Sequence, residues 1–185
     1  APGGRAQHPG SAARGGDVVT LLVSSADARN LKLMAFDVDG VLTDGRLYYG
    51  PDGEALKVFN TLDGHGLKKL AASGVTLALI TGRDTPMVAR RAAELGIQHV
   101  IQGREDKGVA LADLAASLGV TARETGYAGD DEPDVPALQW AQIAFAPASG
   151  HHCARAAADH VTRARGGEGA VREICDALLE HRGDA

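Results

Sequence analysis

The chain has 185 residues, of which 44% are hydrophobic and 4% aromatic, and its formal net charge is −5. This length is enough for one domain with a substantial core, which Ala, Leu and Val must largely fill. The acidic balance and the lack of a basic block argue against a nucleic acid partner. No apolar run approaches the roughly 20 residues of a membrane span, so we expect no membrane partner either.

The N-terminal segment differs in composition from the rest of the chain. Residues 1–17 are rich in Gly, Ala and Pro and lack the charged-then-apolar order of a signal peptide, so we expect a disordered extension. Residues 18–185 are expected to form a single domain. Cys153 and Cys175 match no metal-binding spacing and are too few for a disulfide framework. We therefore expect free thiols and a reducing, cytoplasmic location.

From residue 31 onward, strand and helix patterns alternate along the chain. Apolar runs predict strands at residues 31–37, 75–80, 99–102, 124–128, 143–146 and 160–162. Apolar stripes and cap residues predict helices at residues 66–72, 86–95, 107–118, 135–141, 151–157 and 170–181. This alternation predicts an α/β fold of three layers, with helices on both faces of a mostly parallel, Rossmann-like sheet.

A β-hairpin is expected after the first strand. Two strand patterns, at residues 46–49 and 55–59, flank the turn-forming run Gly50-Pro51-Asp52-Gly53. The chain shows no internal repeat and no sign of a second domain, so the hairpin is expected to belong to the same domain as the sheet.

Two acids, Asp37 and Asp39, stand at the end of the first apolar strand, directly before a glycine. Neighbouring buried carboxylates are costly unless a cation or a proton offsets them, so this pair predicts a metal site. A solvated turn is the alternative, because Asp and Gly are ordinary turn residues. A calcium loop is excluded, because Val41, Leu42 and Tyr48 stand where it requires an oxygen ligand, a glycine and a glutamate.

Polar residues follow four of the predicted strands at their carboxyl ends, where the site of a parallel sheet lies. The four sets are Asp37 and Asp39; Thr81, Gly82 and Arg83; residues 103–107; and Asp130, Asp131 and Asp134. Carboxylates can hold magnesium, and a threonine and a lysine can bind a phosphoryl group. One carboxylate can attack phosphorus while another moves protons, so the sets together suit phosphoryl transfer.

Each set also has a plain structural alternative when it is taken alone. Thr81 and Gly82 suit an ordinary strand end and turn, and Lys107 suits a solvated first helical turn. The acidic loop at residues 130–134 suits helix capping. The phosphoryl-transfer interpretation depends on all four sets falling at strand ends in this order.

The sets resemble, in chain order, the four motifs of the haloacid dehalogenase superfamily of phosphatases: Asp37-Val38-Asp39-Gly40, Thr81-Gly82-Arg83, Lys107 and Gly129-Asp130-Asp131-x-x-Asp134. The resemblance implies that Asp37 is the nucleophile and Asp39 the general acid and base. It also implies that magnesium is held by the carboxylates of Asp37 and Asp130 and by the backbone carbonyl of Asp39.

The same resemblance implies roles for five further residues. Thr81, Gly82 and Lys107 would bind the phosphoryl group. Asp131 and Asp134 would support the metal-bound water molecules and the lysine.

Other motifs are similar to the cap-less branch of this superfamily: Phe59-Asn60, Asp63-Gly64-x-Gly66, Gln102-Gly103, Val161-Thr162-Arg163 and Gly166-Gly167-x-Gly169. Only about 40 residues separate Asp37 from Thr81, which leaves room for the hairpin but not for a cap domain. The resemblance implies a homotetramer in which the hairpins build an intersubunit barrel and a neighbouring subunit completes the site.

The resemblance also implies the substrate, the phosphate ester of a small sugar acid. We expect 3-deoxy-D-manno-octulosonate 8-phosphate, an eight-carbon acid of lipopolysaccharide precursor biosynthesis. The 9-phosphate of a nine-carbon 2-keto sugar acid, and a weakly active tetramerising module, are the alternatives. Candidate substrate-binding residues are Lys68, Arg83, Arg163 and Arg172. Glu168 stands where the resemblance predicts an arginine. Substrate binding by the C-terminal tail, residues 163–172, would therefore fall to Arg163, Arg165 or Arg172.

Overall fold

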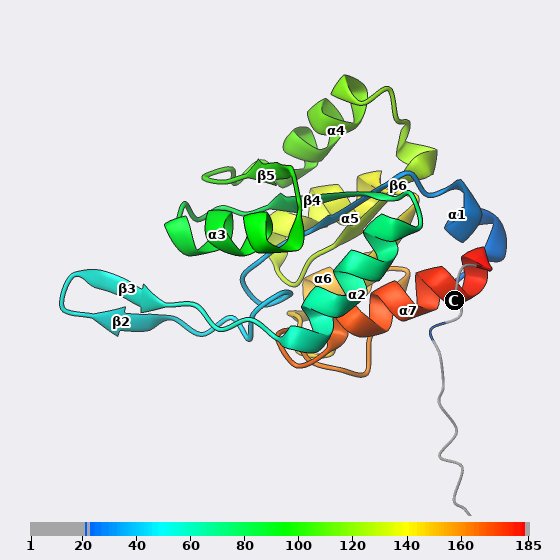
Figure 1. Ribbon diagram of the computed structural model, residues 1–185. Helices are drawn as coiled ribbons and strands as arrows, with labels where there is room; N and C mark the ends of the chain where they lie inside the picture. Colours follow the sequence, from blue (N-terminus) through cyan, green and yellow to red (C-terminus); the bar gives the residue numbers. More distant parts are fainter. Residues whose placement is uncertain (1–20, 22, 184–185) are drawn as a thin grey trace, which may run out of the picture.

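The computed structural model of the protein describes residues 21 and 23–183, and in this part six parallel strands form one sheet (Figure 1). They are β1 (Leu33–Phe36), β4 (Thr76–Ile80), β5 (His99–Ile101), β6 (Thr125–Ala128), β7 (Ile143–Ala146) and β8 (His160–Val161). Their order across the sheet is β5-β4-β1-β6-β7-β8, and every neighbouring pair is parallel. From β1 the chain adds β4 and β5 on one side, and then β6, β7 and β8 on the other side. The switch point, where the order of strand addition reverses, therefore lies between β1 and β6 at the centre of the sheet. The expected extension at residues 1–17 lies outside the described residues.

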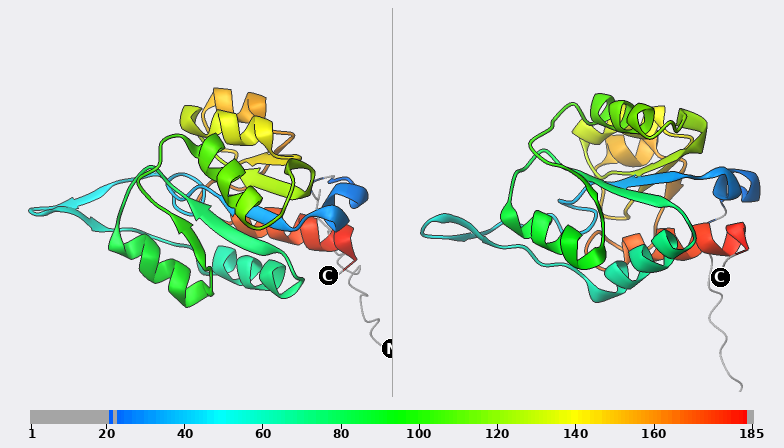
Figure 2. Two further views of the ribbon diagram at one scale, coloured as in Figure 1. Left: turned by 90° about the horizontal axis from the view of Figure 1, so that it is seen from above. Right: turned by 45° about the horizontal axis from the view of Figure 1, so that its top comes forward.

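Helices cover both faces of the sheet, which confirms the predicted three layers (Figure 2). One face carries α1 (Ser25–Asn30), α2 (Thr61–Ala72), α3 (Pro86–Leu95) and α7 (Ala170–Arg182). The other carries α4 (Lys107–Ser117), α5 (Val135–Trp140) and α6 (His152–Ala157). Two short 3₁₀ turns, η1 (Ala122–Glu124) and η2 (Glu132–Asp134), precede β6 and α5. Within residues 23–183, no helix is both long and apolar enough to cross a membrane.

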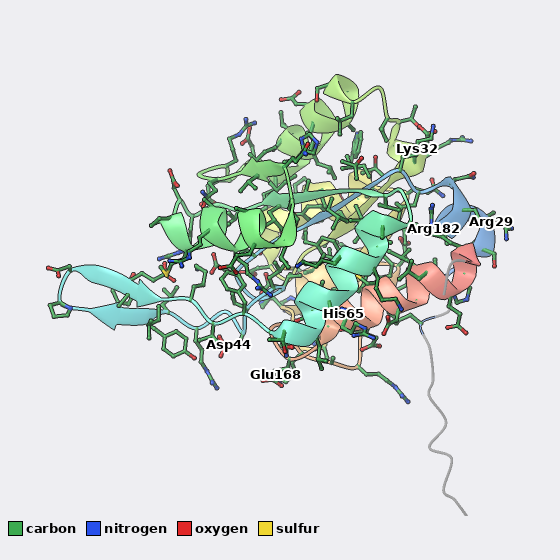
Figure 3. The ribbon with its side chains drawn as sticks, viewed as in Figure 1. Arg29, Lys32, Asp44, His65, Glu168 and Arg182 are labelled. Atoms are coloured by element: carbon green, nitrogen blue, oxygen red, sulfur yellow. The ribbon has the colours of Figure 1, made fainter. Side chains whose placement is uncertain are left out.

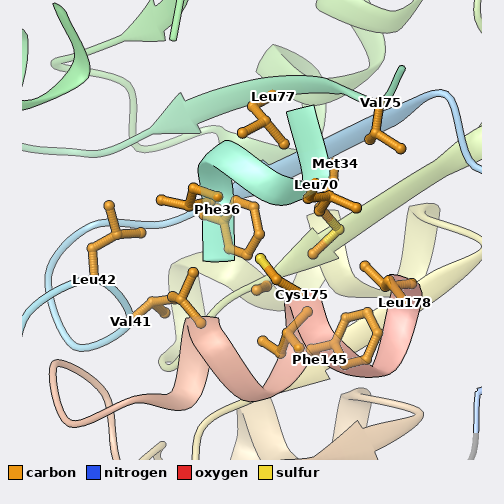
Figure 4. Packing of buried hydrophobic residues seen from close by; sticks show 14 of the residues in the cluster. Met34, Phe36, Val41, Leu42, Leu70, Val75, Leu77, Phe145, Cys175 and Leu178 are labelled. Atoms are coloured by element: carbon orange, nitrogen blue, oxygen red, sulfur yellow. The ribbon is translucent and has the colours of Figure 1, made fainter. Parts of the chain in front are cut away.

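Side chains of β1 alternate between two buried clusters, one on each face of the sheet. Met34 and Phe36 pack in the cluster beneath α2 and α7 (Figure 4), whereas Leu33 and Ala35 belong to the cluster beneath α4 and α5. All four residues are fully buried. This is the two-residue period of a strand, and the sequence looks continuously apolar because helices cover both faces.

The hairpin forms a separate two-stranded antiparallel sheet that projects from the body of the molecule (Figure 1). Its strands are β2 (Tyr48–Gly50) and β3 (Gly53–Leu56), both displaced from the predicted ranges 46–49 and 55–59. The turn between them contains only Pro51 and Asp52. Gly53 has φ +117°, a left-handed conformation that favours glycine, so the strands pair closer to the turn than the pattern predicts.

Helix α2 begins at Thr61, earlier than the predicted start at residue 66. The Asn60 side chain caps it by accepting a hydrogen bond of 2.8 Å from the backbone of its first turn. Gly64 and Gly66, close to the start of α2, lower its helix propensity, which is why the pattern predicts a later start. One of them, Gly66, lies against α7: a Cβ there would stand 2.9 Å from Cδ of Arg172. The glycine therefore allows close packing of two helices.

Helix α1 is absent from the predicted elements, because a helix of six residues is too short to show an amphipathic repeat. Its only buried residue is Ala28. Arg182, near the end of α7, donates hydrogen bonds to the carbonyl oxygens of Ala28 (2.7 Å) and Leu31 (3.0 Å). Figure 3 shows Arg182 beside this helix, so a side chain distant in sequence ties α1 to the domain.

Candidate active site

The predicted site residues meet at the carboxyl ends of the central strands. Asp37 and Asp39 follow β1, Thr81 follows β4, and Asp130 follows β6. They line one cleft of about 290 Å³, whose remaining lining residues are Gly45, Gly82, Arg83, Glu105, Lys107, Asp131, Pro133 and Asp134. The switch point of the sheet therefore brings together side chains from four separate parts of the chain, as the strand-end pattern predicts.

Asp37 forms a buried ion pair at the bottom of this cleft. The Nζ atom of Lys107, the first residue of α4, lies 2.9 Å from Asp37 Oδ1 and 2.8 Å from Asp134 Oδ1. Burial and the charge of Asp134 raise the pKa of Asp37 well above its ordinary value, and Lys107 opposes that rise. Although burial also opposes a charge on Lys107, the two carboxylates hold the pKa of Lys107 above its ordinary value. Lys107 is therefore a fixed cation.

Asp134 organises the loop that carries Asp130. Its Oδ2 accepts hydrogen bonds from the backbone N–H groups of Asp130 (3.0 Å) and Asp131 (3.1 Å). Its Oδ1 accepts a hydrogen bond of 2.7 Å from the hydroxyl group of Tyr127, a fully buried side chain of β6. Because Asp134 is fully buried as well, these bonds hold the acidic loop in one conformation against Lys107.

Three carboxylates of the cleft lie close enough to share a cation. One oxygen each from Asp37, Asp130 and Asp134 lies within 4.8 Å of the others. Burial and the charge of Asp134 raise the pKa of Asp130 to about 7. A single lysine leaves these carboxylates under-neutralised, so the site favours a further cation. Hard oxygen donors of this kind fit magnesium.

Asp39 is held by Lys57, which directly follows the hairpin strand β3, rather than by the six-stranded sheet. Lys57 Nζ donates a hydrogen bond to Asp39 Oδ1 and lies 3.0 Å from Glu54 Oε1. Arg83 Nη2 donates to the other Glu54 oxygen at 2.9 Å. Burial opposes a charge on Glu54, but the contacts with Lys57 and Arg83 lower its pKa below its ordinary value. A chain of four charged side chains therefore joins the hairpin to both sides of the cleft.

Lys57 and Glu54 are functional candidates that the sequence patterns miss. Both stand in or beside a hairpin strand, where charged residues are ordinary solvent-facing residues. No spacing relates them to Asp39, because the contact depends on how the hairpin folds back. In the folded chain the Lys57 side chain is only 1% exposed and that of Glu54 6%.

The loop after β1 is shaped by a glycine and a buried threonine. Gly40 has φ +94°, and a Cβ there would stand 1.9 Å from Asp130 Oδ2. The Thr43 hydroxyl accepts hydrogen bonds from the backbone N–H groups of Gly40 (3.3 Å) and Gly45 (3.2 Å). This turn lets the β1 loop reach the Asp130 carboxylate without a clash.

The residues predicted to bind the phosphoryl group, Thr81, Gly82 and Lys107, all line the cleft. Thr81 is buried, and its hydroxyl accepts a hydrogen bond of 3.3 Å from the backbone N–H of Arg83. A Cβ at Gly82 would stand 2.6 Å from an oxygen of Glu105, so the glycine makes room for that carboxylate. The structure therefore places Thr81, Gly82 and Lys107 in one cleft with Asp37.

Of the four candidate substrate residues, only Arg83 lines this cleft. Lys68 is exposed on α2, away from the cleft lining. Arg163 and Arg172 line a different cavity of about 440 Å³ together with Glu168, the unexpected tail residue. Figure 3 shows Glu168 on the loop before α7. Within one chain, the fold therefore does not bring the tail arginines to the Asp37 cleft.

Comparisons with known proteins agree with this arrangement. Residues 97–174 match the haloacid dehalogenase-like hydrolase family. Over 158 residues the chain is 44% identical to the 3-deoxy-D-manno-octulosonate 8-phosphate phosphatase KdsC of Escherichia coli strain K12, a match that covers 85% of this chain and 84% of that protein.

Two solved structures are similar over most of their length. One is the 3-deoxy-D-manno-octulosonate 8-phosphate phosphatase from Moraxella catarrhalis in complex with magnesium, phosphate and KDO, with TM-score 0.84 and 44% identity over 86% of this chain and 92% of that one. The other is the cobalt-bound enzyme of Haemophilus influenzae, with TM-score 0.83 and 43% identity over 85% of this chain and 92% of that one. This chain belongs to the 3-deoxy-D-manno-octulosonate 8-phosphate phosphatase family of haloacid dehalogenase-like hydrolases.

Proposed function

We propose that this phosphatase hydrolyses 3-deoxy-D-manno-octulosonate 8-phosphate with magnesium as its cofactor, and so serves lipopolysaccharide precursor biosynthesis. The observation that carries the proposal is the buried Asp37, 2.9 Å from Lys107 and within 4.8 Å of the Asp130 and Asp134 carboxylates, at the switch point of the sheet. The Moraxella catarrhalis relative, which was solved with magnesium, phosphate and KDO, supports this choice of substrate and metal.

Asp37 is the proposed nucleophile and Asp39 the proposed general acid and base. An oxygen of Asp37 attacks phosphorus, the bond from phosphorus to the sugar oxygen breaks, and Asp39 gives its proton to that oxygen. Asp39 then takes a proton from water, which attacks the aspartyl-phosphate and releases inorganic phosphate. Asp37 returns to its carboxylate form.

The metal is proposed to bind the carboxylates of Asp37 and Asp130 and the backbone carbonyl of Asp39. Bound magnesium neutralises part of the phosphate charge. Asp131 would support the metal-bound water molecules, and Asp134 holds Lys107 and the loop. The two carboxylate assignments are supported by the closeness of Asp37 and Asp130, whose ligand atoms lie within 4.8 Å of each other and of Asp134.

The phosphoryl group is proposed to bind between Thr81, Gly82 and Lys107. The Lys107 ammonium is a compact positive charge and suits a phosphate oxygen. Arg83 stands at the same side of the cleft and is the proposed contact for the acid end of the substrate. Lys68, Arg163 and Arg172 are proposed to act only across a subunit boundary, because none of them lines the cleft of its own chain.

The assembly is proposed to be a homotetramer in which a neighbouring subunit covers the cleft. The hairpin and the segments beside it expose large apolar side chains, among them Leu47, Tyr49, Leu56 and Val58. Burying such side chains against copies of themselves would stabilise an assembly. The domain is proposed to span residues 18–185, and the free thiols Cys153 and Cys175 support a cytoplasmic enzyme.

The test is phosphate release from a panel of sugar phosphates, with magnesium and with EDTA. We expect the eight-carbon ester to exceed the nine-carbon 9-phosphate by at least about tenfold in kcat/KM, because sugar-acid length decides the fit. EDTA should abolish activity and magnesium should restore it. A reversed preference would overturn the substrate, and no release from any ester would instead favour the tetramerising module.

A further inference from the structure

A second group of side chains that could hold a metal ion lies at the rim of the cleft, and two of its three members, His151 and Cys153, take no part in the proposed chemistry. Asp131, His151 and Cys153 each present a ligand atom within 4.8 Å of the other two. His151 Nδ1 lies 3.0 Å from Cys153 Sγ and 3.8 Å from Asp131 Oδ1. Asp131 and His151 are exposed and Cys153 is half-buried, so an ion can enter from solvent.

The backbone holds these three residues together. The N–H of His151 donates a hydrogen bond of 2.7 Å to the carbonyl oxygen of Asp130, the residue before Asp131. A Cβ on Gly150 would stand 3.3 Å from that same oxygen, so the two loops are in close contact. The Asp131 N–H is bonded to buried Asp134, as described above. Cys153 follows in the first turn of α6, on the same segment as His151.

The donor set differs in chemistry from the carboxylates at the bottom of the cleft. A thiolate, an imidazole and a carboxylate suit zinc, whereas magnesium prefers oxygen ligands alone. Zinc bonds of about 2.0–2.3 Å place tetrahedral ligand atoms about 3.5 Å apart, and the separations of 3.0 and 3.8 Å bracket that value. Three protein ligands would leave a fourth position open.

We propose that Asp131, His151 and Cys153 form a second metal site, selective for zinc or a similarly soft divalent cation, beside the magnesium loop. A metal bound there would hold the Asp131 carboxylate away from the cleft that it lines. Zinc at this site would therefore slow the phosphatase, a consequence that rests on the proposed function. Binding itself does not depend on that function.

Cobalt provides a readout of binding that is independent of activity. The reduced, metal-free protein is titrated with Co²⁺ in an excess of Mg²⁺, which fills the all-oxygen site. We expect one cobalt per chain with a cobalt–thiolate charge-transfer band, because Cys153 supplies a sulfur ligand. Zinc should abolish the band by displacing cobalt.

Variants assign the band to the three residues. Cys153→Ala should remove it although Cys175 remains, and His151→Ala and Asp131→Asn should each weaken cobalt binding by at least about tenfold. His152→Ala is the matched control and should retain the band, because His152 is the adjacent histidine outside the donor set. The site would be overturned if the wild type shows no band, or if the band survives Cys153→Ala. It would also be overturned if neither His151→Ala nor Asp131→Asn changes the band.

Inhibition by zinc tests the consequence separately. With saturating Mg²⁺, the zinc concentration for half inhibition should rise at least about tenfold in Cys153→Ala, whose activity without zinc should match the unchanged enzyme. Equal inhibition of both proteins would overturn the regulatory effect. An inactive protein that still shows the cobalt band would overturn the proposed phosphatase while leaving the metal site standing.

Discussion

The ammonium group of Lys57 is hydrogen-bonded to the carboxylate of Asp39, across 18 positions of the sequence. Lys57 lies just beyond β3, and Asp39 lies in the loop after β1. Glu54 holds the lysine from the other side at 3.0 Å, and the Lys57 side chain is 1% exposed. The proposed acid and base is therefore oriented by the hairpin.

Replacing Lys57 by Met should lower kcat about 10- to 100-fold with little change in KM, because Asp39 loses the partner that positions it for proton transfer. Steady-state kinetics on the eight-carbon ester measures kcat and KM separately. Lys57→Arg should recover part of kcat, which a purely structural role would not require. Lys32→Met is the matched control, because Lys32 is exposed before β1 and outside the cleft lining. An equal loss of kcat in both variants would contradict the positioning role.

Asp37→Asn should lower kcat by at least about 10³-fold, since an amide cannot form the aspartyl-phosphate. The folded state should survive, because the neutral side chain removes a buried charge that Asp134 repels. Kinetics and thermal unfolding on the same samples measure both effects. Asp52→Asn, on the exposed hairpin turn, makes the same chemical change and should keep full activity. Activity retained by Asp37→Asn would end the nucleophile assignment.

Lys107→Met should destabilise the metal-free protein by about 3 kcal/mol, because it leaves the buried carboxylates of Asp37 and Asp134 without a cation. Magnesium should restore part of that loss, since it binds only the folded arrangement. Urea unfolding with and without Mg²⁺ measures both changes. Lys32→Met breaks an exposed ion pair with Glu124 and should cost far less stability, because solvent screens that pair. Similar losses of stability in Lys107→Met and Lys32→Met would argue against a stabilising role of the buried ion pairs of Lys107.

Gly166→Ala should destabilise the protein by about 3 kcal/mol and lower activity, because its Cβ would stand 1.7 Å from the carbonyl oxygen of Gly40. The neighbouring atoms are backbone and cannot rotate away. Gly53→Ala is the comparison: it meets no atom within 4 Å and carries only the strain of φ +117°, about 1 kcal/mol. Urea unfolding measures the free energy of unfolding of both variants. A smaller loss of stability in Gly166→Ala than in Gly53→Ala would contradict the close contact with Gly40.

The contribution of Glu124 to stability should depend on pH. A hydrogen bond from Lys32, followed by one from the Thr121 backbone, lowers the pKa of Glu124 to about 2. Because this pKa lies below the unfolded value of about 4.3, the stabilisation is full above that value and is lost as the pH falls towards about 2. The difference in unfolding temperature between the wild type and Glu124→Gln should therefore narrow between about pH 4 and pH 2. A difference in unfolding temperature that stays constant over this pH range would contradict stabilisation by the Glu124 charge.

Much of the fold could be predicted because its causes are local in sequence. Helix α3 starts at Pro86 after the Thr85 cap, whose hydroxyl accepts from Val88 N at 3.4 Å, and it ends at Gly96 with φ +74°, as predicted. Alternation of strands and helices likewise predicts the parallel sheet. The pattern predicts the start of α2 too late because Gly64 and Gly66 are poor helix formers. Their presence is explained by close packing in the folded chain, of α3 against Gly64 and of α7 against Gly66.

The sequence by itself determined the sheet, the order of the motifs and the meeting of Asp37, Thr81, Lys107 and Asp130, because residues at the carboxyl ends of neighbouring parallel strands converge wherever such a sheet forms. Only the tertiary structure decided that Lys57 and Glu54 reach Asp39, that the arginines of the tail line another cavity, and that His151 and Cys153 stand beside Asp131. The reason is physical: periodicity and capping act within a few residues, whereas the partner of a charged side chain on a hairpin or a loop depends on where distant segments pack.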